Sequence, residues 1–532
     1  MNATSDRVAA RAARAVDSEP AMRGKSAPAR LGLFRYSPLL LLILIVIADG
    51  GQRADPDLWG HLRFGQAALA SGRLAPVDSY SYTAAGAPWR NHEWLTEVIM
   101  AFAYDHLGVV GLKIWKLLCV AATIIFLAAG LAETGAPPAY QFNILTIAAV
   151  ALTPQMEFRP QLYTFAFFAA MLALLGRHLR RGRAPLWVTV PLMALWANLH
   201  GGFIIGCVTL AAYAGAVAIV DLRDGAGLGR GPRLGGLALA ALAATLANPY
   251  GVGIWRTVLR ALRNPATRRA VNDWHPLAFA IMEQWRANHA GVVYFLCAIG
   301  LIAATAIAFA MTPRAGDFPL AVIAAIMSVA AFVAVRNLPL AVIACAAPLA
   351  GHAASLAGRG GADEPARSGV NPWIAGAAAL ALAWYAGILS DRIPMDIPYP
   401  AGAVGFMRRH SLRGNILNDF GWGEYLIWHM EPGSKVFIDG RYDTVYSYAL
   451  INQYLAFRFA LPGAQKVIDG WPHDFVMIAP ETPPFPLMNR DRAWKLIFLD
   501  GDAALFARAN GSAAGVTPQI DPALEPKPGY FP

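Results

Sequence analysis

The chain has 532 residues, of which 56% are hydrophobic and only 15% are charged, and apolar runs recur along most of it. This composition excludes a soluble globular protein and predicts a polytopic α-helical membrane protein, because helices satisfy their backbone hydrogen bonds within one lipid-exposed segment. The net charge of +10 would suit nucleic acid, but the basic residues gather in the N-terminal tail and short loops, as topology signals do. No nucleic-acid partner is therefore expected.

Residues 1–35 are rich in Ala, Arg and Ser and lack an apolar core, so a disordered cytoplasmic tail is expected there and a secretory signal is not. A transmembrane domain is expected over 36–390. The four cysteines all lie in its apolar runs without metal-ligand or disulfide spacing, which predicts packing residues. About eleven membrane helices are predicted, near 36–50, 108–131, 140–154, 162–176, 185–198, 203–221, 234–248, 291–311, 318–335, 338–353 and 372–390.

The predicted spans also give an orientation. Eleven helices that start inside place the C-terminal region outside, and the basic residues of 1–35, 177–183 and 223–233 then fall on the inner side. The expected location is a bacterial inner membrane, with a cytoplasmic N-terminus and a periplasmic C-terminal domain. The arginines of 252–288 are an exception, because the predicted topology places these basic residues outside. Three explanations stay open: an amphipathic helix on anionic lipid, a site for a phosphate-bearing substrate, or an error in the number of helices.

The external loop 51–107 gathers acids and histidines among tryptophans, and two interfacial helices are expected in it. Asp55 and Asp57 flank a proline shortly after the first apolar segment. Either aspartate can cap the helix that follows, or it can act as a general base, because partial desolvation beside indole rings raises the pKa of a carboxylate. Asp57 is the preferred base, since it begins the interfacial helix.

Three other residues of this loop are candidates for substrate binding, namely His61, His92 and Glu93. His92 can orient an aspartate, or it can bind a metal ion together with Asp55, Asp57 or Glu93. A divalent cation, Mg²⁺ or Mn²⁺, is therefore a candidate cofactor, but the sequence assigns no ligand set to it.

Polar residues at the outer ends of later helices add to this external face. Arg159 either pairs with Glu157 or holds a phosphate through its fork of N–H donors, and Arg336 allows the same two interpretations. His200 stands before a glycine pair that permits close approach of a ligand. Arg159, Arg336 and His200 are all candidate substrate-binding residues.

After residue 391 the chain alternates short β-like runs with helical stretches and Gly- and Pro-rich turns, which predicts a periplasmic α/β domain over 391–532. Two glycine-flanked stretches, 414–428 and 435–443, concentrate acidic and aromatic residues. These are either ordinary turn residues or a rim that contacts sugar by ring stacking and carboxylate hydrogen bonds. The candidate rim residues are Trp422, Glu424, Tyr425, Asp439 and Arg441.

The order of these elements resembles the GT-C membrane glycosyltransferases, which combine many membrane helices with a large acidic first external loop and, in many members, a C-terminal soluble domain. The motifs ADPDLWGHLRFG, WRNHEWLTEV, FRPQ, NLHGG, NPYG, GWGEYLIW and FIDGRYD together are similar to a large group of bacterial GT-C-like proteins. By position, the resemblance assigns Asp55 or Asp57 as catalytic base or metal ligand. The acceptor motif of oligosaccharyltransferases is not carried over, because GWGEYLIW lacks its paired Trp and its Trp-Asp step.

The resemblance implies an inverting transfer of a hexose or pentose from a polyprenyl-phosphate donor to a hydroxyl of a glycan, lipid or protein acceptor. Asp57 or Asp55 would deprotonate the acceptor, while Arg159 would stabilise the departing lipid phosphate. Membrane lipids are the other expected partner. Two alternatives stay open: a non-catalytic scaffold or receptor of surface polysaccharide assembly, and a transporter or flippase, for which no charged relay lies at mid-membrane depth.

Overall fold

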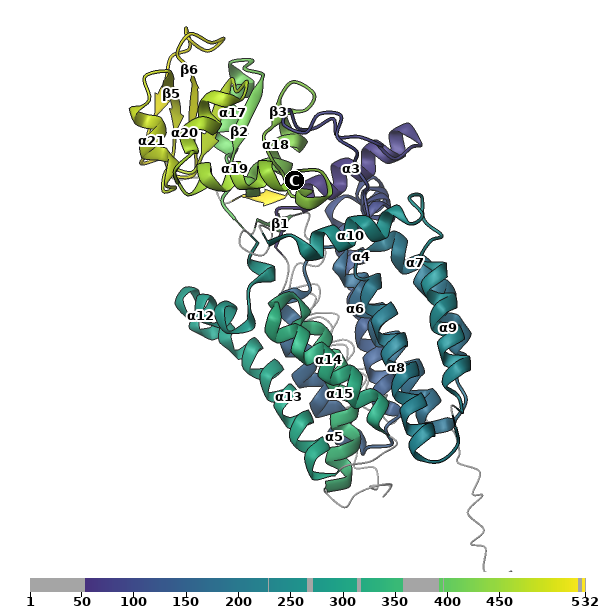
Figure 1. Ribbon diagram of the computed structural model, residues 1–532. Coiled ribbons are helices and arrows are strands. Elements are labelled where there is room, and N and C mark those ends of the chain that lie inside the picture. The colour runs from purple at the N-terminus through teal and green to yellow at the C-terminus, as the bar shows by residue number, and fades with distance from the viewer. Residues whose placement is uncertain are drawn as a thin grey trace, which may run out of the picture.

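In a computed structural model of the chain, a bundle of long helices carries an α/β domain at one end (Figure 1). The structure describes residues 53–227, 229–265, 271–312, 317–356, 392–395, 397–524 and 529–531. The external loop, in purple, lies at the same end of the bundle as the α/β domain, in green and yellow (Figure 1). The N-terminal tail and the helices expected near 36–50 and 372–390 lie outside the described residues.

The bundle helices follow the expected apolar runs. They are α4 (Trp94–Ala132), α5 (Pro138–Leu152), α6 (Gln161–Arg181), α7 (Thr189–Leu199), α8 (Phe203–Arg223), α9 (Gly231–Ala244), α13 (Val292–Met311), α14 (Phe318–Val333) and α15 (Leu338–Leu356). Within the described ranges, five helical segments are long and apolar enough to cross a membrane. The predicted multi-pass helical protein is confirmed, whereas the total of about eleven spans stays a prediction.

The helix α15 forms the centre of the bundle, since it packs against α4, α5, α6, α13 and α14. Its residues from Leu338 to Ala346 are all buried, and Ala341, Ala344 and Ala346 among them are small. Small side chains let helix backbones approach closely, which favours helix association in lipid. The outer helices instead expose large apolar side chains, among them Leu118, Ile125, Leu296 and Val329, as a lipid-facing surface requires.

The helix α4 connects the external loop to the bundle. It contains the second expected interfacial segment, and a non-helical residue, Gly108, interrupts it with φ 60° and ψ −147°. Glycine adopts a positive φ without the steric cost that a Cβ would bring. The interruption separates the start of α4, which carries Glu97 on its first turn, from the part that runs through the bundle.

Helices form in the segments where interfacial helices were expected, at the end of the bundle that carries the α/β domain (Figure 1). The first, α3 (Leu58–Ser71), ends at Gly72, which adopts the left-handed conformation common after a helix (φ 64°). In the arginine-rich segment, α10 (Gly253–Arg263) and α12 (Leu277–Ala287) form. The helix α10 buries Ile254 and Thr257 and exposes Arg256 and Arg260, as an amphipathic helix does. It lies across the end of the bundle, next to the α/β domain (Figure 1).

The α/β domain contains a six-stranded mixed sheet in the order β3-β2-β4-β6-β5-β7. Strands β3 and β4 lie parallel on either side of β2, and β6 runs antiparallel to β4 and β5. The central strand β4 is buried at every position, which explains its continuous apolar run. The strands are β2 (Asn415–Asn418), β3 (Lys435–Val436), β4 (Phe475–Ile478), β5 (Trp494–Leu499), β6 (Ala504–Arg508) and β7 (Gln519–Ile520).

Five helices accompany this sheet: α17 (Ala401–Arg409), α18 (Gly423–Met430), α19 (Tyr448–Arg458), α20 (Ala464–Gly470) and α21 (Pro484–Arg490). A short antiparallel pair, β1 (Ile393–Pro394) and β8 (Tyr530–Phe531), brings the two ends of the C-terminal region together. The α/β region predicted from the sequence is therefore confirmed.

Backbone hydrogen bonds join the external loop to this sheet, a connection that the sequence did not indicate. The Tyr82 N–H donates to the Val436 carbonyl oxygen at 3.2 Å, and the Val436 N–H donates to that of Tyr80 at 3.3 Å, so the loop extends the sheet beyond β3. The Thr83 hydroxyl also donates to the Phe437 carbonyl oxygen. This pairing holds the loop, and with it α3, against the C-terminal domain.

Candidate active site

The acids of the external loop meet residues of the α/β domain in one place. Asp57 precedes α3, Glu93 and Glu97 lie at the start of α4, and Glu424 reaches in from α18. Together with His61 and Arg441 they line a cavity of about 60 Å³, the central cavity. The site is thus built from segments more than 300 residues apart in the sequence.

Asp57 is placed to exchange a proton with a bound molecule. It occupies the N-cap position of α3, but its side chain accepts no capping hydrogen bond. A quarter of the side chain, 25%, stays exposed, so a substrate can reach it. Desolvation and the charge of Asp55 raise the pKa of Asp57 to about 7, against the opposing charges of Arg159 and His61. A carboxylate with this pKa is an effective general base near neutral pH.

Arg159 contacts three carboxylates. Its guanidinium lies 2.8 Å from Asp273, 3.1 Å from Asp57 and 3.8 Å from Asp55. Burial alone would lower the pKa of Arg159, but these carboxylates raise it well above the usual range. Asp273 was not among the candidates; the signal that could have found it is that the arginine-rich segment 252–288 contains only two acids, Asp273 and Glu283. The network fixes Asp57 from the side of the bundle.

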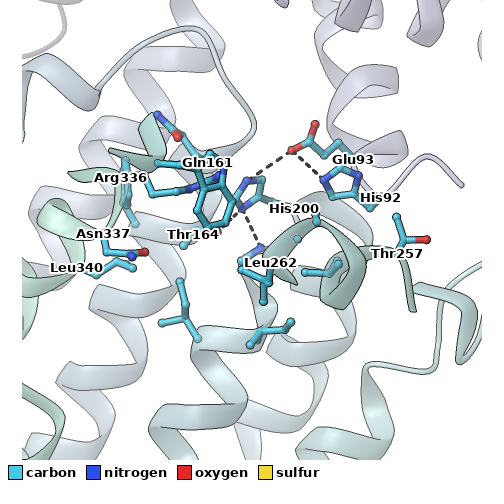
Figure 2. A pocket seen from close by; sticks show the side chains of 18 of the residues that line it. His92, Glu93, Gln161, Thr164, His200, Thr257, Leu262, Arg336, Asn337 and Leu340 are labelled. Atoms are coloured by element: carbon cyan, nitrogen blue, oxygen red, sulfur yellow. Dashed lines mark hydrogen bonds and ion pairs between the residues drawn. The ribbon is translucent and has the colours of Figure 1, made fainter. Parts of the chain in front are cut away.

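Glu93 lies between two imidazoles (Figure 2). Its Oε1 is 3.6 Å from His92 Nε2 and 3.4 Å from His200 Nε2. Burial would raise the pKa of Glu93, but the neighbouring histidines lower it to about 2, so this carboxylate is ionised. His200 Nδ1 accepts hydrogen bonds from the Gly202 N–H and the Thr164 hydroxyl, which places the ring proton on Nε2, toward Glu93. Burial lowers the pKa of His200 to about 3 and keeps the ring neutral.

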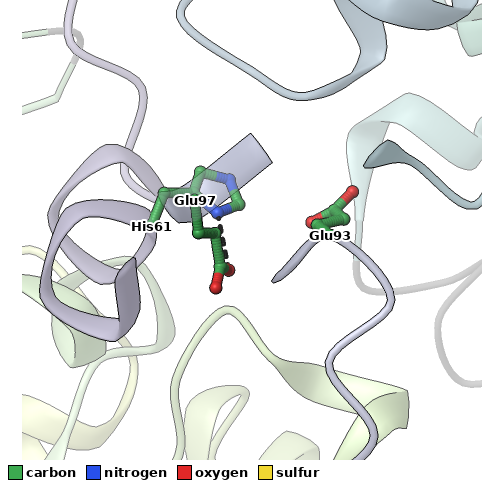
Figure 3. A group of neighbouring side chains, drawn as sticks. All are labelled: His61, Glu93 and Glu97. Carbon is green, nitrogen blue, oxygen red and sulfur yellow. Dashed lines mark hydrogen bonds and ion pairs between the residues drawn. The ribbon is translucent and has the colours of Figure 1, made fainter. Parts of the chain in front are cut away.

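Three side chains form a group that fits a divalent cation (Figure 3). The ligand atoms of His61, Glu93 and Glu97 all lie within 4.8 Å of one another. His61 Nδ1 is 3.2 Å from one Glu97 oxygen, and the Asn91 amide donates to the other. Two carboxylates and an imidazole suit Mn²⁺ or Mg²⁺. The ligand set considered from sequence centred on His92, and Glu97 was not among the candidates.

A second cavity, of about 220 Å³, adjoins the central cavity at His92, Glu93 and Thr444. It is called the bundle cavity, and it is lined by α10 and by the outer parts of α6, α8 and α15. His200 and Arg336 make it polar at one end (Figure 2), and Arg336 also stacks on the Trp274 ring at 4.5 Å. Part of the wall is apolar, with Phe165, Ile204, Ile205 and Leu340, and the remainder also includes polar side chains such as Gln161 and Asn337.

A third cavity, of about 350 Å³, adjoins the central cavity through a different set of residues, Phe64, Trp89, Asn91 and Glu97. It is called the loop cavity, because α3 and the remainder of the external loop line it. Ala67 and Ala68 leave room within it. The central cavity is therefore bordered by two larger cavities that meet it at separate residues.

Asp439 and Arg441 form a buried ion pair. Arg441 donates to Asp439 through Nε and Nη2, at 2.9 and 2.7 Å, and its Nη1 lies 2.7 Å from Asp78 of the external loop. The guanidinium also lies within 5.2 Å of the ring centroids of Phe64, Tyr80 and Trp89. These contacts bind the α/β domain to the loop; a role of either residue in substrate binding stays a prediction.

Trp422 and Tyr425 make packing contacts, and each is only 4% exposed. The Trp422 indole donates to the Pro398 carbonyl oxygen at 2.9 Å, and the Tyr425 ring meets the Trp59 ring edge-on at 5.1 Å. Neither residue lines the three cavities described above. Of the three candidates in and just before α18, Glu424 reaches the central cavity, while the sugar contacts expected of Trp422 and Tyr425 stay predictions.

Comparison with protein-family models and with curated protein sequences gave no match. Solved structures do show similarity. The chain resembles the oligosaccharyltransferase of Archaeoglobus fulgidus, whose crystal structure holds a tethered acceptor peptide with the NVT sequon. The TM-score is 0.51 and the sequence identity is 12%, and the match covers 83% of this chain and 69% of that one. It also resembles the mycobacterial arabinofuranosyltransferase AftD, with a TM-score of 0.51 at 14% identity over 90% of this chain and 39% of that one.

The two similar structures are thus an oligosaccharyltransferase and an arabinofuranosyltransferase, both glycosyltransferases. The resemblance to GT-C proteins that the sequence indicated is thereby confirmed for the fold. The chain spans well under half the length of AftD, so AftD has large parts without a counterpart here.

Proposed function

We propose that the protein is a membrane glycosyltransferase that moves a sugar from a polyprenyl-phosphate donor to a hydroxyl acceptor on the periplasmic face, with inversion at the anomeric carbon. The GT-C fold supports a glycosyltransferase. The observation that carries the proposal is Asp57, a partly exposed carboxylate with a pKa of about 7 in the central cavity, which two larger cavities adjoin.

The bundle cavity suits the donor. Arg336 offers a guanidinium for a phosphate, and neutral His200 offers a further polar contact. The apolar wall of Phe165, Ile204 and Leu340 suits the start of a prenyl chain. Because this cavity meets the central cavity at His92 and Glu93, a donor phosphate held by Arg336 would place its sugar toward Asp57.

The loop cavity gives the acceptor a separate approach. An acceptor hydroxyl that enters the central cavity would pass its proton to an Asp57 carboxylate oxygen while its oxygen bonds to the anomeric carbon. The bond between that carbon and the donor phosphate oxygen breaks in the same displacement, and the phosphate leaves with the electron pair. Single displacement accounts for the inversion.

His61, Glu93 and Glu97 would hold a divalent cation, which supplies positive charge to stabilise phosphate as it departs. Asn91 orients Glu97 for this role through its amide. Burial alone would lower the pKa of His61, but the hydrogen bond to Glu97 and the nearby carboxylates raise it to about 9, so His61 must lose a proton to become a ligand.

Comparative mass spectrometry of lipids and glycans from a deletion strain tests the proposed function. We expect one glycoconjugate to lose a sugar, and we expect the wild-type protein but not Asp57→Asn to restore it. Asp521→Asn is the matched control, since Asp521 lies exposed in the α/β domain, away from the cavities. Restoration by Asp57→Asn would instead support a non-catalytic scaffold, and substrate flux into proteoliposomes of purified protein would support a transporter.

A further inference from the structure

The Glu424 carboxyl group belongs to the α/β domain but bonds to the first turn of α3. Its Oε2 accepts a hydrogen bond from the Gly60 N–H at 3.0 Å, between residues 364 positions apart in the sequence. Glu424 is only 4% exposed, so this bond forms away from bulk water. Gly60 is the third residue of α3, where the backbone N–H has no partner within the helix.

An N-terminal amide of this kind is usually satisfied by the side chain of the N-cap residue. The N-cap of α3 is Asp57, whose residue type commonly fills that role, yet its side chain accepts no bond from the helix. Its backbone is helical, with φ −78° and ψ −12°, and its carboxylate lies 3.1 Å from Arg159. Glu424 thus makes the bond that a capping Asp57 would make.

Two glycines give Glu424 the space to do this. A Cβ at Gly60 would overlap the Glu424 carboxyl group. A Cβ at Gly440 would overlap Asp57 Oδ1 and come within 2.7 Å of Glu424 Oε1. The two acids therefore lie against the same face of Gly440, where the α/β domain borders the central cavity. Burial and the nearby charge of Asp57 raise the pKa of Glu424 well above its usual range, which favours its neutral form.

We propose that Glu424 is a positioning residue, which caps α3 across the domain interface and so leaves the Asp57 carboxylate free to act as the base. This inference rests on the proposed function for its catalytic consequence, but the cap itself is a separate structural claim. The α/β domain then fixes the catalytic aspartate, and its docking is a condition for activity.

Hydrogen exchange of the full-length protein in detergent tests the cap without reference to activity. In Glu424→Ala we expect amides at the start of α3 to exchange roughly 2- to 30-fold faster, the range that corresponds to loss of one helix cap. Glu424→Gln should restore slow exchange, because its amide oxygen can accept the Gly60 N–H. Glu481→Ala, at an exposed glutamate of the same domain, is the matched control. Unchanged exchange in Glu424→Ala would overturn the proposal.

Transfer assays test the catalytic consequence. We expect kcat of Glu424→Ala to fall by roughly 10- to 100-fold, as a small displacement of a catalytic group does, with the donor KM nearly unchanged. Glu424→Gln should recover most of that loss. A loss in Glu424→Gln as large as in Glu424→Ala would overturn the positioning role and indicate that Glu424 acts through its charge or proton.

Gly60→Ala tests the same contact from the other side and is available if Glu424→Ala does not fold. Its Cβ would displace the Glu424 carboxyl group, so we expect the same faster exchange at α3. In the Glu424→Ala background this substitution should add little, because the group with which it collides is gone. Full additivity of the two changes would overturn the proposal. If the wild-type protein transfers no sugar but Glu424→Ala still exchanges faster at α3, the proposed function is refuted. The cap is then supported all the same.

Discussion

Asp57 forms an ion pair with Arg159, whose permanent charge affects the titration of Asp57. Desolvation raises the pKa of Asp57 to about 7, and the Arg159 charge limits that rise. Because the base must be deprotonated, we expect kcat/KM to rise with pH through about 7 and to fall about tenfold per unit below it. Arg159→Gln should move this midpoint upward, while Arg159→Lys, which keeps the charge, should move it less. A midpoint that stays fixed in Arg159→Gln would show that another group is titrating.

Arg336 is expected to act on donor affinity and to leave this pH midpoint in place, since it lines the bundle cavity away from Asp57. Loss of a charge-assisted hydrogen bond to the donor phosphate in Arg336→Gln should raise the donor KM by roughly 10- to 100-fold. Steady-state kinetics with a polyprenyl-phosphate sugar measures the change. Arg490→Gln, at an exposed arginine of α21, is the control. An unchanged KM would remove Arg336 from the donor site.

His61, Glu93 and Glu97 predict a cation that competes with protons. His61 has a pKa of about 9, so the ion must displace a proton at neutral pH, and Mn²⁺ should bind more tightly as the pH rises toward 9. Isothermal titration of the full-length protein at several pH values measures this, and Glu97→Gln should weaken binding at all of them. Binding that is equally tight in Glu97→Gln would place the ion elsewhere.

Arg441 connects two structural elements, the external loop and the α/β domain. Arg441 joins Asp439 of the domain to Asp78 of the loop, and all three are at least 93% buried. In Arg441→Met both aspartates would keep buried charges without their guanidinium partner. Removal of one member of a buried ion pair costs roughly 3–5 kcal/mol.

We therefore expect Arg441→Met to lower the thermal unfolding midpoint of the purified protein and to make residues 72–88 sensitive to limited proteolysis. The loop should open first at 72–88, because the polar contacts then left between that part of the loop and the described part of the domain are the short edge pairing at Tyr80–Thr83 and the hydrogen bond between Tyr82 and His473. Arg409→Met, which removes an exposed arginine of α17, is the control. Unaltered proteolysis of the loop in Arg441→Met would show that the other contacts between the loop and the domain suffice to hold it.

Across the whole molecule, local sequence patterns predicted the elements better than the site. Asp57 and Glu93 stood out as acids of the external loop and His200 by its place before a glycine pair, and they do meet around adjoining cavities. Asp273 gave a weaker signal, as an acid within an arginine-rich segment, and Gly440 gave none, since their importance comes from contacts with Arg159 and Asp57 that only folding creates. Asp439 and Arg441 lie in a glycine-flanked turn, so their local sequence favoured a substrate-binding rim. They are instead buried as an ion pair, and that burial involves Asp78, which is distant in the sequence.

The orientation of the whole molecule decides which substrates can reach Asp57. Nucleotide sugars are confined to the cytoplasm, so a periplasmic α/β domain fits a lipid-linked donor.

Cysteine labelling in intact spheroplasts tests whether the α/β domain is periplasmic. We expect Ser512→Cys, at an exposed position of the α/β domain, to react with a membrane-impermeant maleimide, and Arg233→Cys, exposed near the start of α9, to react only after lysis. The wild-type protein is the control, because its cysteines at 119, 207, 297 and 345 are buried or partly buried. The reverse pattern would place Asp57 in the cytoplasm and remove the reason to prefer a polyprenyl-phosphate donor.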